Sequence, residues 1–88
     1  MIEEMLNGYG YMHLQMGQPE KALMFFKLNV EYFPKSPNAY NSMADFYEAQ
    51  NDIPNAIRFT KKAAELSDNE YYEKRILELK KINEGLTL

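Results

Sequence analysis

The side chains of this 88-residue chain that are capable of chemistry are few and widely separated. The serines are Ser36, Ser42 and Ser67, and none lies in the Gly-X-Ser-X-Gly setting that exposes a nucleophile. His13 is the single histidine and therefore the only candidate general base, and no cysteine is present to supply a thiolate. The sequence therefore predicts no catalytic residue and no enzymatic activity within this segment.

Two further patterns resemble ligand sites but have simpler interpretations. Asp45 and Glu48 are three residues apart on a predicted helix and could share a cation, but no third ligand is close in sequence, which favours a solvated face. The run Gly8–Gly10 resembles a phosphate-binding loop, but it falls inside a helical pattern without a preceding strand. His13 lies on an apolar stripe, which favours packing over catalysis or metal binding. We expect neither a metal ion nor a cofactor.

Composition and charge restrict the classes of partner. The formal net charge is −3, and the basic residues are interleaved with acids, so we expect no nucleic-acid binding. No apolar run approaches the roughly 18 residues that cross a bilayer, and Glu3 and Glu4 stand where a signal peptide carries positive charge. Hydrophobic residues make up 45% of the chain, which predicts one folded domain over residues 1–88. Lack of cysteine is compatible with any compartment, so the localisation stays open.

Apolar residues recur at intervals of three and four, which predicts helices throughout the chain. A first helix, with an apolar stripe that includes Leu6, Tyr9, Met12, His13 and Met16, should end at Gly17. A second should run from Pro19 to Pro34. Ser36 should cap a third helix over residues 37–50, and Asp52 should cap a fourth that ends near Ser67. Ser67 and Glu70 have capping-box spacing and should open a fifth helix that Gly85 terminates.

Residues of similar type recur at a spacing of 34. The first copy has Leu6, Tyr9, Gly10, His13, Ala22, Phe26 and Pro34, and the second has Tyr40, Met43, Ala44, Tyr47, Ala56, Thr60 and Asp68. Two of these positions are small in both copies, which lets helix axes approach to about 8–10 Å. The pattern resembles the tetratricopeptide repeat, a helix–turn–helix unit of this length, and the resemblance covers residues 3–70. Thr60, Asp68 and His13 depart from the usual aromatic, proline and tyrosine.

The resemblance implies an all-α fold with two antiparallel helix–turn–helix repeats, over residues 3–36 and 37–70, and a capping helix over 71–84. This would form a short right-handed α-solenoid that acts through protein contacts. Its first helices should line a concave face for a protein or peptide partner, or be merely solvated. The candidate residues are Asn7, Tyr11, Leu14, Gln15, Asn38, Asn41, Ser42, Asp45 and Glu48. We expect no chaperone-type carboxylate clamp, because the corresponding positions hold no cation and Asp45 and Glu48 would repel a carboxylate.

The first helix carries an apolar flank at Ile2, Met5 and Met12 that no earlier helix covers. We expect this flank to dock a preceding domain of the same chain or a second copy, forming a homodimer through the first helix. The stretches Phe26–Glu31 and Pro34–Met43 are also similar to repeat pairs at the C-terminal end of bacterial serine hydrolases, both esterases and beta-lactamase-like proteins. That resemblance implies a noncatalytic accessory domain, periplasmic or secreted, whereas a free-standing adaptor would be cytoplasmic.

Overall fold

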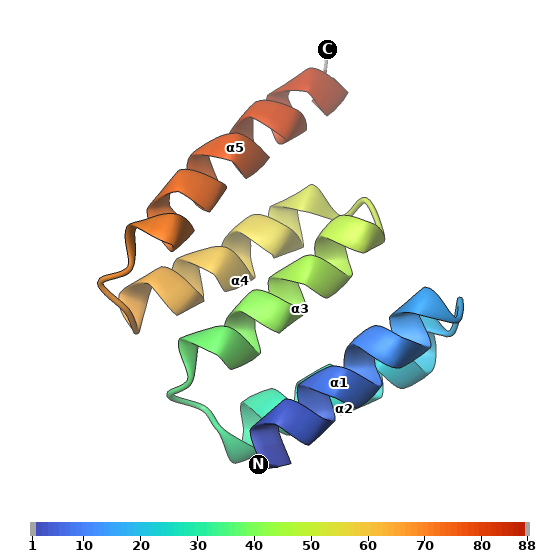
Figure 1. Cartoon of the computed structure of the whole chain (residues 1–88). Coiled ribbons are helices and arrows are strands. Elements are labelled where there is room, and N and C mark those ends of the chain that lie inside the picture. The colour runs from blue at the N-terminus through green and yellow to red at the C-terminus, as the bar shows by residue number, and fades with distance from the viewer. Residues whose placement is uncertain (1, 88) are drawn as a thin grey trace.

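The computed structural model describes residues 2–87, which form five α-helices and no strand (Figure 1). The helices are α1 (Ile2–Gln15), α2 (Pro19–Tyr32), α3 (Pro37–Ala49), α4 (Ile53–Glu65) and α5 (Glu70–Thr87). The predicted all-α class is therefore confirmed. Connections of three or four residues join the helices, so consecutive helices run antiparallel and each packs against the next. The molecule extends over 38 × 31 × 15 Å, and α3, α4 and α5 lie side by side across its breadth.

The ends of the first four helices follow the local signals in the sequence. Ser36 caps α3 by accepting a hydrogen bond from the amide of Ala39 at 3.4 Å. Asp52 caps α4 by accepting one from the amide of Asn55 at 3.3 Å. Gly17 follows α1 with a φ of 73°, the left-handed conformation that glycine adopts without a Cβ penalty. These three predictions are confirmed because each depends only on residues within one turn.

Both predicted ends of the fifth helix are wrong. Asn69, not Ser67, caps α5, since its side-chain oxygen accepts a hydrogen bond from the amide of Tyr71 at 3.0 Å. Ser67 instead accepts a hydrogen bond from the amide of Asn69 in the preceding turn, at 3.1 Å. At the other end, α5 passes through Gly85 to Thr87. An internal glycine costs a helix only about 1 kcal/mol relative to alanine, so Gly85 by itself does not end the helix.

The core forms where α2 meets α3 and where α4 meets α5. Ala22 and Phe26 pack against Met43 and Phe46 in the first cluster. The second cluster contains Ile53, Ala56 and Leu79 and so joins α5 to α4. Different pairs of helices therefore form different parts of the core, because each helix contacts mainly its neighbours in sequence.

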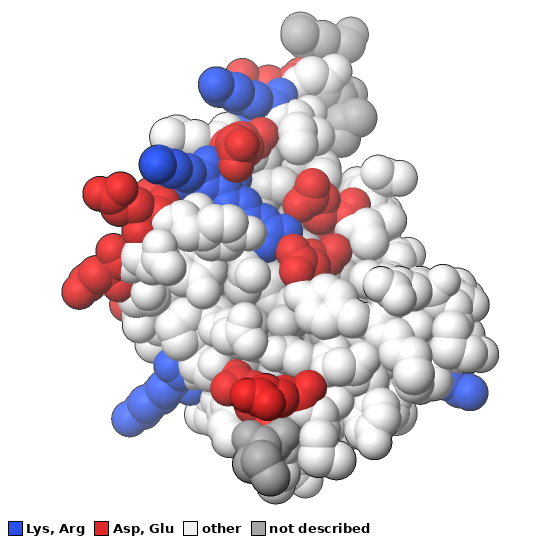
Figure 2. Space-filling model, viewed as in Figure 1, with Lys and Arg blue, Asp and Glu red and all other residues white. Residues whose placement is uncertain are grey.

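The predicted apolar stripe of α1 is only partly buried. The buried residues of this helix are Asn7 and Gly10, whereas Tyr9, Met12 and Met16 are exposed. Gly10 faces the ring of Phe26, so the side of α1 with the smallest residue is the side that packs most closely against α2. The larger apolar side chains are therefore left on the outer side. Figure 2 shows that the surface over α1 carries few charged side chains, with acidic ones gathered near its N-terminal end.

The contact at Gly10 predicts opposite effects for two glycine substitutions in one helix. An added Cβ at Gly10 would lie 2.4 Å from the Phe26 ring, whereas one at Gly8 would meet nothing within 4 Å. We expect Gly10→Ala to destabilise the fold by about 1–3 kcal/mol through overpacking. Gly8→Ala should stabilise it by up to about 1 kcal/mol through helix propensity. Urea unfolding measures both, and a stabilised Gly10→Ala variant would contradict the close approach of α1 and α2.

Candidate functional site

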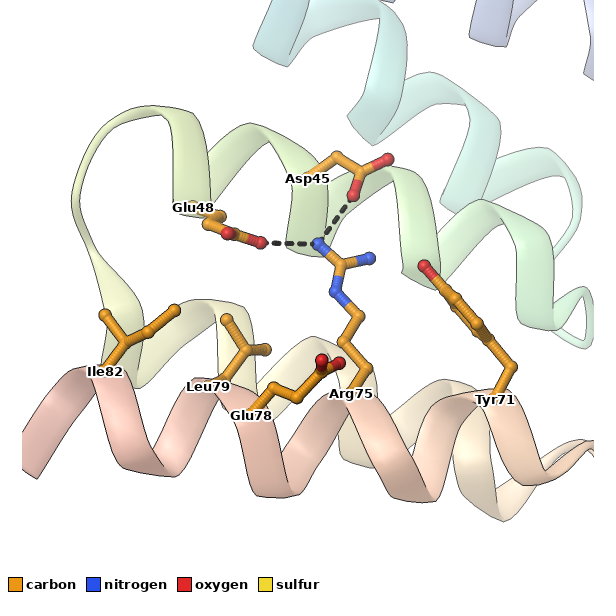
Figure 3. Close-up of a pocket in the computed structure, with 7 residues that line it drawn as sticks. All are labelled: Asp45, Glu48, Tyr71, Arg75, Glu78, Leu79 and Ile82. Atoms are coloured by element: carbon orange, nitrogen blue, oxygen red, sulfur yellow. Dashed lines mark hydrogen bonds and ion pairs between the residues drawn. The ribbon is translucent and has the colours of Figure 1, made fainter.

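Arg75 of α5 is a buried cation that contacts three polar side chains of α3, and Figure 3 shows two of these contacts. Its Nη2 lies 2.6 Å from Asp45 Oδ1 and 2.9 Å from Glu48 Oε1. Its Nη1 donates a hydrogen bond of 2.6 Å to the side-chain oxygen of Asn41. Asn41, Asp45 and Glu48 stand four and three residues apart, so a single face of α3 presents them all to one guanidinium.

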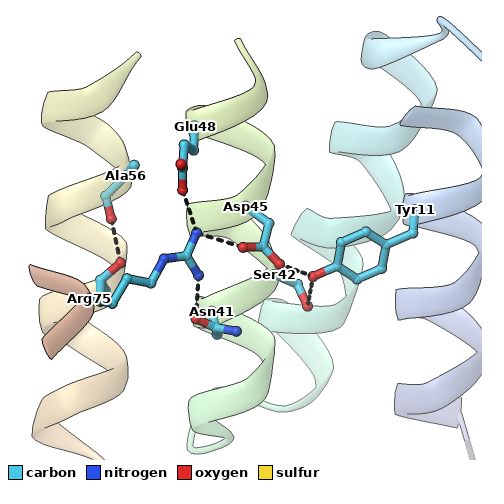
Figure 4. Close-up of polar contacts among 8 residues, drawn as sticks. Tyr11, Asn41, Ser42, Asp45, Glu48, Ala56 and Arg75 are labelled. Carbon is cyan, nitrogen blue, oxygen red and sulfur yellow. Dashed lines mark hydrogen bonds and ion pairs between the residues drawn. The ribbon is translucent and has the colours of Figure 1, made fainter. Parts of the chain in front are cut away.

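The polar contacts continue from α3 to α1 through Tyr11 (Figure 4). The hydroxyl of Tyr11 donates a hydrogen bond to Asp45 and lies 3.3 Å from Ser42 Oγ. Asp45 therefore receives Tyr11 on one oxygen and Arg75 on the other. The result is a row of polar contacts, which we call the polar row, that runs from α1 across α3 to α5.

The environment of the polar row maintains the protonation states that these contacts require. Burial raises the pKa of Tyr11, and the hydrogen bond to Asp45 raises it further, so the hydroxyl remains a donor. Burial by itself lowers the pKa of Arg75, but the carboxylates of Asp45 and Glu48 outweigh burial and the net shift is upward. The arginine thus stays charged although only 7% of its surface is exposed.

A cleft of about 350 Å³ opens between α3 and α5 beside this arginine (Figure 3). Its lining residues are Asp45, Glu48, Tyr71, Arg75, Glu78, Leu79 and Ile82. Three carboxylates surround one guanidinium, so the cleft has a net negative charge. Leu79 and Ile82 form an apolar part of its wall. The arrangement combines an acidic rim with an apolar surface, and both can contact a side chain that has an aliphatic stem and a cationic end.

Several residues predicted for a peptide-binding face are engaged in internal packing instead. Asn7 is buried between α1 and α2, where its side-chain oxygen accepts a hydrogen bond from Asn29 at 2.7 Å. Leu14 packs against the α2–α3 core cluster, and Ser42 is only 1% exposed. The expectation that these side chains point away from the core is therefore wrong. Helical spacing alone predicts that they lie outside the core. Polar side chains can nevertheless be buried when a residue of the next helix forms hydrogen bonds with them.

The other predicted residues occupy three different settings. Tyr11 and Asn41 belong to the polar row but do not line the cleft. Asp45 and Glu48 belong to both. Gln15 and Asn38 are exposed and line neither. With Ser42, which contacts the Tyr11 hydroxyl, the structure thus brings together five of the nine predicted residues in the polar row.

Arg75 is the site residue that the sequence reasoning missed. Helix α5 places this guanidinium between Asp45 and Glu48, two side chains for which the sequence favoured a solvated face. A signal was available, since Arg75 lies 34 residues after Asn41, the same interval as the internal repeat. Continued past residue 70, however, this interval puts Lys74, Glu78 and Lys81 where an apolar, a small and an aromatic residue are expected, so the sequence favours a capping helix there.

The acidic residues of the described segment do not form a metal-binding cluster. Asp45 and Glu48 share Arg75 as a counter-ion, which differs from the purely solvated face expected for them. Over residues 2–87 no group of three histidine, aspartate or glutamate side chains is arranged to hold a metal ion. Within the same range, no helix has the length and apolarity to cross a membrane. His13 stacks on Phe25 with ring centroids 5.3 Å apart, in agreement with a packing role.

Comparison of the chain with family models, curated proteins and solved structures yields no match. The functional assignment therefore depends on the geometry of the residues themselves.

The contacts of Arg75 predict a large effect from removing its charge. We expect Arg75→Gln to lower the free energy of unfolding by about 1–3 kcal/mol, because Asp45 and Glu48 would then face each other without a counter-ion. Their side chains are 33% and 42% exposed, so solvent screening places the effect toward the lower value. Lys74→Gln removes an exposed cation from the same helix and should change stability by less than about 0.5 kcal/mol. Equal effects in urea unfolding would contradict a structural role for Arg75.

The raised pKa of Tyr11 predicts the direction in which the stability of the fold changes with pH. Its pKa is higher in the folded chain than the value of about 10 in the unfolded chain, so the stabilisation is complete below about pH 10 and is lost as pH rises above it. The wild-type chain should therefore be more stable than Tyr11→Phe at pH 7. The difference between them should narrow from about pH 10 upward, by at most about 1.4 kcal/mol per pH unit. A difference that stays constant or grows at alkaline pH would contradict this assignment.

Proposed function

We propose that this chain is a noncatalytic protein-interaction module of the tetratricopeptide type that binds a peptide in the cleft between α3 and α5. The observation that carries the proposal is the cleft itself, in which three carboxylates and two aliphatic side chains surround a buried arginine. The complementary ligand is an extended peptide with lysine or arginine next to an apolar residue. Such a ligand would place its cation against the acidic rim and its aliphatic part on Ile82, which is 44% exposed.

Spatial contacts between equivalent positions support the repeat assignment. Tyr11 contacts Asp45, and Asn41 contacts Arg75, and each pair is separated by 34 residues. Stacked repeats bring equivalent positions of neighbouring units side by side, so such pairs are expected to meet. The second pair would extend the repeat into α5, which then both caps the array and supplies a repeat position.

Burial of the small residues supports the same assignment. Ala22, Ala44 and Ala56 have no exposed surface, and Gly10 is buried against Phe26. These are the positions at which the resemblance requires small side chains for close helix packing. The buried Thr60 replaces the usual aromatic, and its hydroxyl donates a 2.7 Å hydrogen bond to the carbonyl of Ala56, which satisfies it within α4.

Preformed contacts within the polar row would reduce the entropy lost on binding. Arg75 contacts Asp45, Glu48 and Asn41 in the absence of any ligand. The carboxylates on one side of the cleft are therefore already oriented when a peptide arrives, and less side-chain freedom remains to be lost. Glu78 on the opposite helix is exposed and adds the charge that the arginine does not neutralise.

A noncatalytic accessory domain within a larger hydrolase is a second candidate function. The observation that favours it is the exposure of the predicted docking flank, where Ile2, Met5 and Met12 are 59%, 54% and 44% exposed. In this alternative the flank packs against another domain or another copy, and the cleft has no ligand. The two functions use different helices and can be tested separately.

Peptide binding to the cleft can be tested with two labelled probes by fluorescence anisotropy. One probe alternates lysine with leucine, and the other has glutamate in place of every lysine. We expect the lysine probe alone to bind, with an affinity that falls as salt increases. Binding of neither probe, or of both equally, would contradict the proposal.

A matched pair of variants locates the binding site. Glu78→Gln removes a carboxylate from the cleft, whereas Glu73→Gln removes one from the same helix outside it. We expect the first substitution to weaken binding of the lysine probe by roughly threefold to tenfold and the second to leave binding unchanged. Equal losses would mean that the probe responds only to net charge.

A further inference from the structure

An unbroken stripe of exposed apolar side chains runs along the whole length of α1. Its members are Ile2, Met5, Tyr9, Met12 and Met16, the last just beyond the helix end, with exposed fractions between 42% and 60%. They succeed one another at intervals of three, four, three and four, the spacing of the a and d positions of a coiled-coil heptad. We call these residues the α1 stripe. It includes both the predicted flank and side chains that the sequence had assigned to the core.

The borders of the α1 stripe carry no formal charge. At 100° per residue, the neighbouring positions on its two sides are Leu6 and His13 on one and Gly8 and Gln15 on the other. The acidic residues of the first turn, Glu3 and Glu4, point more than about 100° away from the centre of the stripe. A second helix laid along the stripe therefore desolvates apolar surface without burying an unpaired charge.

Gly8 lies at one edge of the stripe and has no side chain to stand beside it. It is exposed, and a Cβ built there would meet nothing within 4 Å. Without a side chain at this position, the backbone of another helix can approach α1 more closely there. The three methionines of the stripe are flexible and adapt to an opposing helix, as methionines at binding surfaces do.

We propose that the α1 stripe binds the α1 stripe of a second copy of this chain, forming a symmetric antiparallel homodimer. In the antiparallel arrangement the stripe is complementary to itself about Tyr9, its central member. Ile2 then lies opposite Met16, Met5 lies opposite Met12, and the two Tyr9 rings meet at the twofold axis.

Charge selects the antiparallel direction over the parallel one. Two parallel copies would bring both Glu3–Glu4 pairs to the same end of the interface, where the like charges repel. In the antiparallel pair each acidic end lies beside the other helix's C-terminal end, and the helix dipoles are oppositely directed.

The exposed area of the stripe agrees with a modest dimer. Five half-exposed side chains of roughly 200 Å² each would bury about 500 Å² per copy. The total of about 1,000 Å² for two copies lies at the lower limit for a specific interface. We therefore expect association that depends on protein concentration in the micromolar range.

Light scattering behind a sizing column tests this proposal over a series of concentrations from about 1 µM to about 1 mM. We expect the mass to rise from monomer to dimer. Met12→Glu should raise the dissociation constant by at least about tenfold, because it buries a charge at the centre of the interface. Met24→Glu is the matched control, since Met24 is 50% exposed but lies on α2, and this variant should dimerise like the wild type. A monomer throughout the series, or equal effects of the two variants, would overturn the proposal.

Cysteine cross-linking tests the direction of the helices, because the natural chain has no cysteine. Met5→Cys mixed with Met12→Cys should form a disulfide-linked heterodimer in far greater yield than either variant alone. Homodimers of each variant alone without the mixed product would overturn the antiparallel arrangement. Peptide binding by Met12→Glu should equal that of the wild type, since the cleft lies on α3 and α5. Loss of dimerisation and loss of peptide binding can therefore be distinguished.

Discussion

The need to neutralise one buried guanidinium organises the part of this molecule where α1, α3 and α5 meet through polar contacts. Arg75 is almost fully buried, and a cation in that position is tolerated only when hydrogen-bonded anions surround it. Asp45 and Glu48 meet that requirement, and Asn41 accepts a further hydrogen bond. These contacts connect α5 to α3, although the main packing partner of α5 is α4. They also set the two sides of the cleft, so its shape depends on the same interaction.

Asp45 extends this constraint to the opposite end of the chain. One of its oxygens pairs with Arg75 and the other accepts the hydroxyl proton of Tyr11, so α1, α3 and α5 are coupled through a single carboxylate. The polar row is accordingly a structural element as well as part of a candidate binding surface. A carboxylate that already has two partners contributes less to a new ligand than one without them, which is why Glu78 is central to the proposed peptide site.

The two proposed interaction surfaces rely on different physical effects. The cleft offers charge complementarity and a small apolar area, so its binding should be sensitive to salt. The α1 stripe offers apolar area without charge, so association there depends on the hydrophobic effect and scarcely on ionic strength. Because they lie on separate helices, the chain has the means to self-associate through α1 while its cleft remains open.

The sequence by itself determined the helical class and most of the helix ends, since Ser36, Asp52 and Gly17 act within a single turn. It also identified Gly10 as a point of close approach and the apolar flank of α1. Only the tertiary structure decided that Arg75 meets Asp45 and that Asn7 is buried against Asn29. Helical periodicity shows which side of a helix is apolar, but a polar side chain is buried only when a partner on another helix satisfies it. That partner is distant in sequence, so the packing of the helices decides whether the two meet.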